Sequence, residues 1–144
     1  ELAQGRWVEA ADHFKGAVRL APTLGMGWHQ LGLSLWNAGD HPAAVEAFTR
    51  SLEVAPGHVA RVAPRLSLAR TYLGISAVKS GRTKEAAEHF RRAVELSPDC
   101  SSCWINLARA QAQSGERPRA RESCRRAMTL DRNEAAAEFC RTLR

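Results

Sequence analysis

The stretch WHQLGLSLWNAGDHPAAVEAFTRSLEVAP, residues 28–56, decides the fold of this chain. Two groups of apolar and small residues in it follow the i, i+3, i+4, i+7 spacing of a helix face. The groups are Trp28, Leu31, Gly32 and Leu35, and then Ala44, Ala47, Phe48, Ser51 and Leu52. Between them, Gly39 suits a left-handed turn and Pro42 the first turn of a second helix. The stretch therefore predicts two helices joined by a tight turn, each with one buried face.

The rest of the chain repeats this unit. Equivalent residues stand 34 positions earlier, 42 positions later and then 34 positions later again. They are Gly5, Ala10, Phe14, Ala17 and Pro22; Gly74, Gly81, Ala86, Phe90, Ala93 and Pro98; and Trp104, Leu107, Ala108, Gly115, Ala120 and Ala127. We expect a single domain, 1–144, with repeats at about 1–24 (partial), 25–58, 59–100 and 101–132, and a capping helix at 133–144. Roughly ten residues of the first helix are expected to be missing from the partial repeat.

The repeat at 59–100 carries an insertion of eight residues around His58–Leu66, before its first helix. Pro64 can occupy the first turn of a helix that runs to about Ser80. The insertion would then lengthen this helix by roughly two turns. A plain loop accounts for the same residues equally well, so the sequence leaves both alternatives open.

The segment 133–144 does not continue the repeat, because Glu138 stands where a further copy would have a large apolar residue. Asn133 can cap a last helix. The apolar face of that helix would be Ala136, Phe139, Cys140 and Leu143. We expect a helix that covers the open end of the stack, or the start of a chain that continues.

The four copies resemble the tetratricopeptide repeat family, whose pattern is a Trp, a Leu-Gly pair, an Ala and a Phe on a second helix, and a final Pro. The resemblance implies an all-α fold, a right-handed α-solenoid of antiparallel helix pairs. It would contain three full repeats, an N-terminal half repeat and a C-terminal capping helix. It also implies a concave groove, lined by the first helix of each repeat, that binds a peptide segment of another protein.

Side chains that point off the buried faces of the first helices would line this groove. They are His29, Gln30, Leu33 and Trp36; Thr71, Tyr72, Ile75 and Lys79; and Asn106, Arg109 and Gln113. Trp36 is a candidate anchor for a partner, because Leu35 already fills the core side of its helix. Packing against an adjacent repeat or against missing N-terminal residues is the alternative. Leu33 and Ile75 stand where the carboxylate clamp of some tetratricopeptide proteins has polar groups. Clamping of acidic chaperone C-termini is therefore not expected.

No catalytic residue, metal site or cofactor is expected. Cys100 and Cys103 form one CxxC pair, which is half of a zinc site, but no second pair follows. A redox role is not favoured, because no βαβ pattern surrounds the pair. Cys124 and Cys140 fall on apolar helix faces and are interpreted as small core residues.

The chain has 21 Lys and Arg against 15 Asp and Glu, a net charge of +6 that favours acidic partners without specifying one. Several arginines crowd residues 117–126, and a solvated outer face is the simplest interpretation. Nucleic acid is an unlikely partner, because no aromatic residues are interleaved with the arginines. No apolar run approaches the roughly 18 residues of a membrane span, so membrane insertion is not expected.

These observations favour a protein-binding adaptor or scaffold that is not itself an enzyme. The alternative is a regulatory or substrate-docking segment of a larger enzyme, with further domains in the same chain. A basic surface for nucleic acid or another polyanion is the weaker alternative. No signal peptide is visible, but the chain opens on Glu1 without a Met, so this carries little weight. The compartment is unknown from the sequence, with the cytoplasm favoured.

Overall fold

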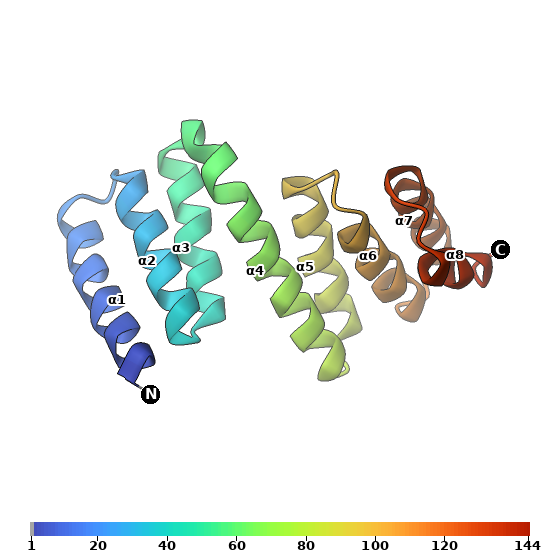
Figure 1. Ribbon diagram of the computed structural model, residues 1–144, viewed down its shortest axis with the longest axis horizontal. Coiled ribbons are helices and arrows are strands. Elements are labelled where there is room, and N and C mark those ends of the chain that lie inside the picture. Colours follow the sequence, from blue (N-terminus) through green and yellow to red (C-terminus); the bar gives the residue numbers. More distant parts are fainter. Residues whose placement is uncertain (1) are drawn as a thin grey trace. The chain divides into compact units, whose positions relative to one another are not determined.

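The computed structural model describes residues 2–144, which form helices and no strand (Figure 1). The elements are α1 (Leu2–Leu20), α2 (Gly25–Ala38), α3 (His41–Val54), the short 3-10 helix η1 (Pro56–His58), α4 (Val59–Lys79), α5 (Thr83–Leu96), α6 (Ser101–Gln113), α7 (Arg117–Leu130) and α8 (Glu134–Arg141). The predicted all-α fold is confirmed. Among residues 2–144, a segment able to span a lipid bilayer is not found in any helix.

The helices divide into two compact units, one that ends at Ala69 and one that comprises Arg70–Arg144. Helix α4 contributes residues to both units. In the first unit, α2 packs against α1 and α3. In the second unit, α6 packs against α5 and α7, and α8 contacts α7. In each of these pairs, helices that follow one another in the chain are packed neighbours, as the repeat pattern predicts.

The turn between the two helices of a repeat depends on glycine. Gly39 has a φ of 92°, and its backbone N–H caps the end of α2 by donating to the carbonyl of Trp36. Gly81 and Gly115 occupy the equivalent turns and also have positive φ values. Asp40 then caps α3 by accepting from the Ala43 N–H at 3.2 Å. These turns are short because residues without a Cβ adopt the left-handed conformation at little cost.

The insertion in the third repeat is helical, which settles the choice that the sequence left open. Helix α4 starts at Val59 and is 21 residues long, against 14 for α2. Val62 and Leu66 in the added turns are buried, so packing stabilises the extension. Pro64 lies inside the helix and not in its first turn, contrary to the expectation. Because Pro64 lacks an N–H, the carbonyl of Ala60 loses its usual helical donor.

In the first unit, the core lies between α2 and α3. Phe48 is among the largest fully buried side chains, and its ring covers the backbone of Gly32. The Ser51 hydroxyl donates to the carbonyl of Gly25 at 2.8 Å in the buried space between the same two helices. The helix pair is therefore held by an aromatic contact at its middle and a buried hydrogen bond at its end.

Trp28 and Trp104, the tryptophans of the repeat pattern, are half-buried and form hydrogen bonds with the turn that precedes their helices. The indole N–H of Trp28 donates to the carbonyl of Pro22 at 2.8 Å, and that of Trp104 donates to the carbonyl of Pro98 at 2.9 Å. Trp28 thus lies only partly buried on the face of α2 that the pattern assigns to the core. The amphipathic indole suits this position, with one apolar face packed and its N–H satisfied.

In the second unit, the core passes from α4 to α7. Phe90 packs with Ala77, Val94 and Leu107, which come from α4, α5 and α6. Further along, a buried polar pair joins α6 to α7: the Ser123 hydroxyl donates to Oε1 of Gln111 at 2.7 Å. The two residues occupy the positions that Leu35 and Ala47 hold in the second repeat. Their mutual hydrogen bond offsets the cost of placing polar groups there.

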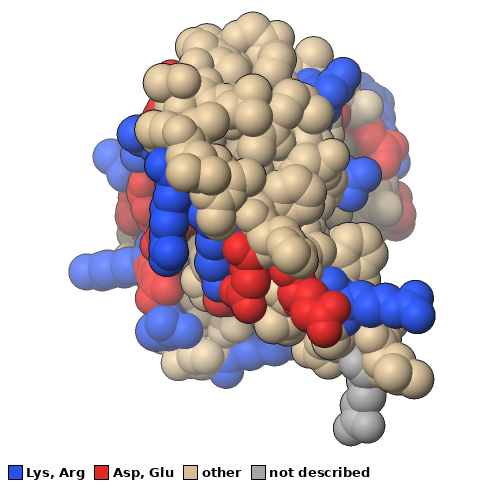
Figure 2. All heavy atoms as spheres, turned by 90° about the vertical axis from the view of Figure 1, so that its left-hand side faces the viewer, with Lys and Arg blue, Asp and Glu red and all other residues tan. Residues whose placement is uncertain are grey.

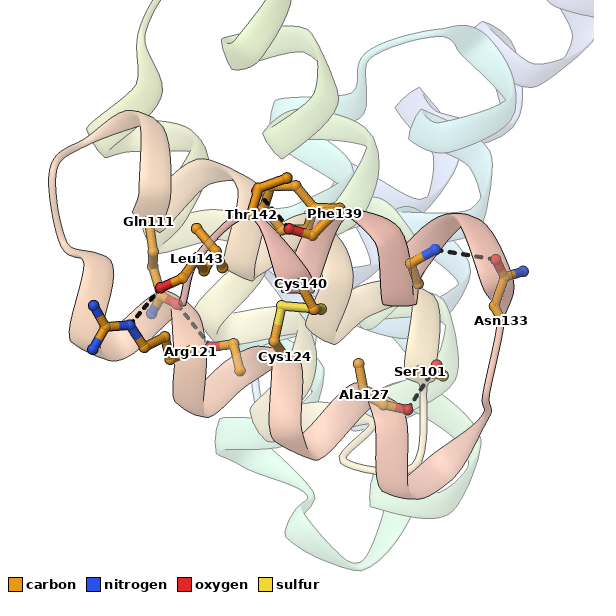
Figure 3. The surroundings of a disulfide bond; sticks show 12 residues. Ser101, Gln111, Arg121, Cys124, Ala127, Asn133, Phe139, Cys140, Thr142 and Leu143 are labelled. Carbon is orange, nitrogen blue, oxygen red and sulfur yellow. Dashed lines mark hydrogen bonds between the residues drawn. A yellow bond between two sulfur atoms is a disulfide. The ribbon is translucent and has the colours of Figure 1, made fainter.

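The four cysteines form two disulfides, which the sequence interpretation did not predict. Cys124 and Cys140 form a disulfide that joins α7 to α8, and Cys100 forms a disulfide with Cys103 at the start of α6. Cys124 does lie in an apolar cluster with Leu143 and Ala108, as expected from its helix face. Asn133 caps α8, as predicted, by accepting from the N–H groups of Ala135 and Ala136 (Figure 3).

Candidate functional site

The predicted groove residues of the first unit lie on α2, and His29 among them is buried. Its side chain is only 7% exposed and packs against Phe48, with ring centroids 5.8 Å apart. Neither ring nitrogen of His29 has a hydrogen-bond partner among the described residues. The expectation that His29 offers a donor to a ligand is therefore corrected: in this structure it belongs to the α2–α3 core.

Burial and positive neighbours lower the pKa of His29 below its usual value of 6.5. Desolvation of the imidazolium is the larger cause, and repulsion from Arg61, Arg65 and His58 acts in the same direction. The folded state therefore resists protonation of this histidine more than the unfolded chain does. His89 in the second unit shows the same direction, since burial and Arg70 outweigh the opposing effect of Glu85 and Glu88.

We expect the free energy of unfolding to fall as the pH drops from 7.5 to 5.5. The stabilisation is fully present above pH 6.5 and is lost as the pH falls from there towards the lowered pKa, because the unfolded chain then binds protons that the folded one does not. One such histidine changes stability by at most about 1.4 kcal/mol per pH unit. Urea unfolding at both pH values measures this loss, which should shrink in His29→Leu. A His13→Leu variant, changed on the exposed side of α1, should keep it.

The other predicted residues of α2 are half-buried. The ring of Trp36 lies 4.3 Å from that of His41, at the start of α3. Trp36 therefore packs within its own repeat, a contact that the sequence interpretation did not consider. The side chains of Gln30 and Leu33 are partly open to solvent. The first unit therefore offers a mixed surface on α2 with no large exposed apolar side chain among the four predicted residues.

In the second unit, helix α4 presents exposed apolar side chains. Gly74 and Ala77 face the core under α5, which turns the opposite side of the helix outward. Tyr72 and Ile75 on that side are 47% and 41% exposed, and Lys79 lies one turn further on. Thr71 is half-buried beside them. We call Tyr72, Ile75 and Lys79 the α4 strip.

The predicted residues of α6 divide by exposure. Arg109 is exposed, and its guanidinium carbon lies 5.4 Å from the ring centroid of Phe139, which positions a cation on the surface of this unit. Gln113 is also exposed, whereas Asn106 is half-buried. The α6 surface can therefore supply hydrogen-bond donors to acidic or carbonyl groups of a partner.

Besides Val59 at its start, two exposed apolar residues of α4 were not singled out from the sequence. They are Leu68 in the first unit and Val78 in the second. Their signal was present, because Leu68 stands four residues before Tyr72 and Val78 three after Ile75 on one helix. The 34-residue repeat pattern does not predict their exposure, because α4 is longer than the first helix of the standard repeat.

Among residues 2–144, no three His, Cys, Asp or Glu side chains come together in a group that could hold a metal ion. The CxxC sulfurs are joined to each other. Charge on the face that Figure 2 shows is mixed, with basic and acidic side chains beside one another. On α1, for example, Lys15 and Asp12 form an ion pair at 3.1 Å.

Comparison with known proteins agrees with this architecture. Two family models described as tetratricopeptide repeat match residues 23–99 and 72–137. No curated protein sequence matches the chain. Similar solved structures include MamA 41-end from Desulfovibrio magneticus RS-1, with a TM-score of 0.59 and 21% identity, covering 99% of this chain and 76% of that one.

Two further structures have titles that mention peptides. YrrB, described as a protein with an unusual peptide-binding site, has a TM-score of 0.55 and 20% identity over 98% of this chain and 69% of its own. The first such domain of Spaghetti (RPAP3), solved with an HSP90 peptide, has a TM-score of 0.51 and 14% identity over 83% of this chain and 92% of its own. Identities this low establish the fold alone. The family models match more than half of the chain and show that it belongs to the tetratricopeptide repeat family.

Proposed function

We propose that this protein is an interaction module that binds a peptide segment of another protein on the first helices of its repeats. The observation that carries the proposal is the α4 strip. There, Tyr72 and Ile75 lie one turn apart and are exposed, although the opposite side of α4 is buried. Exposed aromatic and aliphatic side chains of this kind serve as anchors in protein interfaces. Peptide binding by YrrB and by the Spaghetti domain supports the same mode of action.

The ligand that fits the α4 strip combines apolar and acidic character. Tyr72 and Ile75 offer apolar contact, while Lys79 at one end of the strip attracts a carboxylate. Arg109 and Gln113 on α6 add donors in the same unit. His29 is left out of the proposal because it is buried, and Trp36 is a secondary candidate because His41 covers part of its ring.

The proposal assigns no catalytic step to the chain, and its alternative is the docking segment of a larger enzyme. Both have the same binding surface and differ in what else the full-length protein contains.

The two disulfides bear on the location of the protein, because such bonds persist in oxidising compartments and are rare in the cytosol. They favour an oxidising compartment over the cytoplasm expected from the sequence.

A peptide library displayed on phage provides the test. Peptides selected by the full chain should bind Tyr72→Ala at least about tenfold more weakly than the parent, because an anchor loses its contact area. Thermal unfolding of the variant should change little, since the side chain is half exposed. Leu130→Ala serves as the matched control, because Leu130 is similarly exposed on α7. Equal affinity for Tyr72→Ala and the parent would refute the assignment of the site to α4.

A further inference from the structure

A second surface of the Arg70–Arg144 unit lies between α7 and α8, where an open groove has a volume of about 990 Å³. Its floor is apolar and is formed by Met128, Ala137 and the Cys124–Cys140 disulfide. We call this the α7–α8 groove. It is separate from the α4 strip, because none of the residues that line it belongs to α4 or α6.

The walls of the groove are held in place by covalent and polar links (Figure 3). The disulfide ties the middle of α7 to the end of α8. Arg121 Nε donates to the carbonyl of Leu143 at 2.6 Å, and Arg117 donates to the carbonyl of Thr142 at 3.2 Å. The groove therefore exists before a ligand arrives, which lowers the ordering cost of binding.

The groove is strongly basic. Five arginines line it against a single acid, Glu134. They are Arg121, Arg125, Arg132, Arg141 and Arg144. Arg125 pairs with Glu122, and Arg141 pairs with Glu134. Arg132 and Arg144, in contrast, are exposed and form no ion pair with any residue in 2–144, so two cations at this groove are available to a ligand.

We propose that the α7–α8 groove binds an acidic segment of another protein. Carboxylates of the segment pair with Arg132 and Arg144, and an apolar side chain packs on Met128 and Ala137. The charge of the lining calls for an anion, and the apolar floor calls for a ligand that also carries hydrocarbon. Arginine is suited to this task because its planar guanidinium binds a carboxylate through two hydrogen bonds.

The composition of the groove disfavours two other occupants. Single-stranded nucleic acid would need aromatic side chains for its bases, and none lines the groove. A second copy of this chain would bring like charge, because the chain has a net charge of +6. The proposal does not rest on peptide binding at the α4 strip, since the residues of the two surfaces do not overlap.

Fluorescence anisotropy with a defined probe tests the proposal. The probe is a fluorescein-labelled peptide of glutamates with one central leucine, and it is titrated with the full chain. Arg132→Ala/Arg144→Ala should weaken binding by at least about tenfold, because two charge-assisted contacts are lost. Arg6→Ala/Arg19→Ala changes the net charge equally but on exposed positions of α1 and should stay within about twofold of the parent.

The apolar contribution has its own readout. Replacing the leucine of the probe by serine should weaken binding to the parent, and Met128→Gln should abolish the difference between the two probes. Melting temperatures of all variants establish that they fold. Tyr72→Ala should bind the leucine probe like the parent, which separates this site from the α4 strip.

Four results would overturn the inference. The first is that the probe does not bind, and the second is that the two double-arginine variants lose the same affinity. The third is that an oligouridylate binds more tightly than the peptide and competes with it. The fourth is that the chain self-associates in sedimentation experiments and that Arg132→Ala/Arg144→Ala disrupts this association. The second result would mean diffuse attraction, the third a nucleic-acid surface and the fourth an interface between copies. A fifth result would overturn it as well: loss of leucine-probe binding in Tyr72→Ala would mean that the acidic peptide occupies the α4 strip instead.

Discussion

Replacing Phe48 by alanine should lower the free energy of unfolding by about 3–5 kcal/mol, the cost of deleting a buried aromatic side chain. Phe48 is 1% exposed, lies against Gly32 and contacts the ring of His29. The side chain of alanine would leave a cavity between α2 and α3 that neither backbone can close without losing the Ser51–Gly25 hydrogen bond. Urea unfolding followed by helical circular dichroism measures the loss.

Phe14→Ala is the matched control for this prediction. Phe14 stands 34 residues earlier at the same position of the repeat, but its side chain is only half-buried on α1. Less apolar surface is transferred to water when it is removed, so its cost should be clearly smaller. A loss below about 1 kcal/mol for Phe48→Ala, or equal losses at the two positions, would contradict the α2–α3 packing described above.

The second large effect is expected at Gly74, where an added methyl group has no room. A Cβ at this position would lie 2.5 Å from Cε1 of Phe90, far inside the contact distance, and the ring of Phe90 is enclosed by the core of the second unit. Gly74→Ala should therefore cost about 1–3 kcal/mol through overpacking, although alanine is the better helix former. The same urea experiment measures this cost.

Gly16→Ala provides the opposite sign as a control. Gly16 is also inside a helix, α1, but a Cβ there would meet no atom within 4 Å. Its replacement should stabilise the protein by about 0.5–1 kcal/mol, the difference in helix propensity. The double variant Gly74→Ala/Phe90→Leu should recover part of the loss at Gly74, because the two positions share one contact. Stabilisation by both alanines would show that α4 and α5 are not in close approach.

The repeat architecture can be predicted from the sequence, because it depends on interactions between residues that are close together in the chain. The spacing of apolar residues defines the faces of the helices, and glycine at 39, 81 and 115 marks turns whose φ values only glycine adopts readily. Each of these inferences uses residues within one repeat.

The sequence left the conformation of the insertion undecided, because its local pattern fits both a helix and a loop. Residues 59–66 are compatible with a helix or a loop, because Pro64 suits both a helix start and a turn. Burial of Val62 and Leu66 decided the outcome, and that burial requires the packed structure. The sequence also left Trp36 between two roles, and its contact with His41 is visible only once α2 and α3 are placed together.

For the candidate surfaces, some properties follow from the sequence and others only from the tertiary structure. From the sequence alone come the helix pairs, their order and the exposed position of Tyr72 and Ile75 on α4, because these depend on the helical period. The burial of His29 and the joining of Cys124 to Cys140 come only from the tertiary structure. A histidine next to a core position changes sides with a small rotation of its helix, and two cysteines 16 residues apart meet only if α8 folds back onto α7. Both outcomes depend on how one helix packs against another, and a periodic pattern along a single helix does not contain that information.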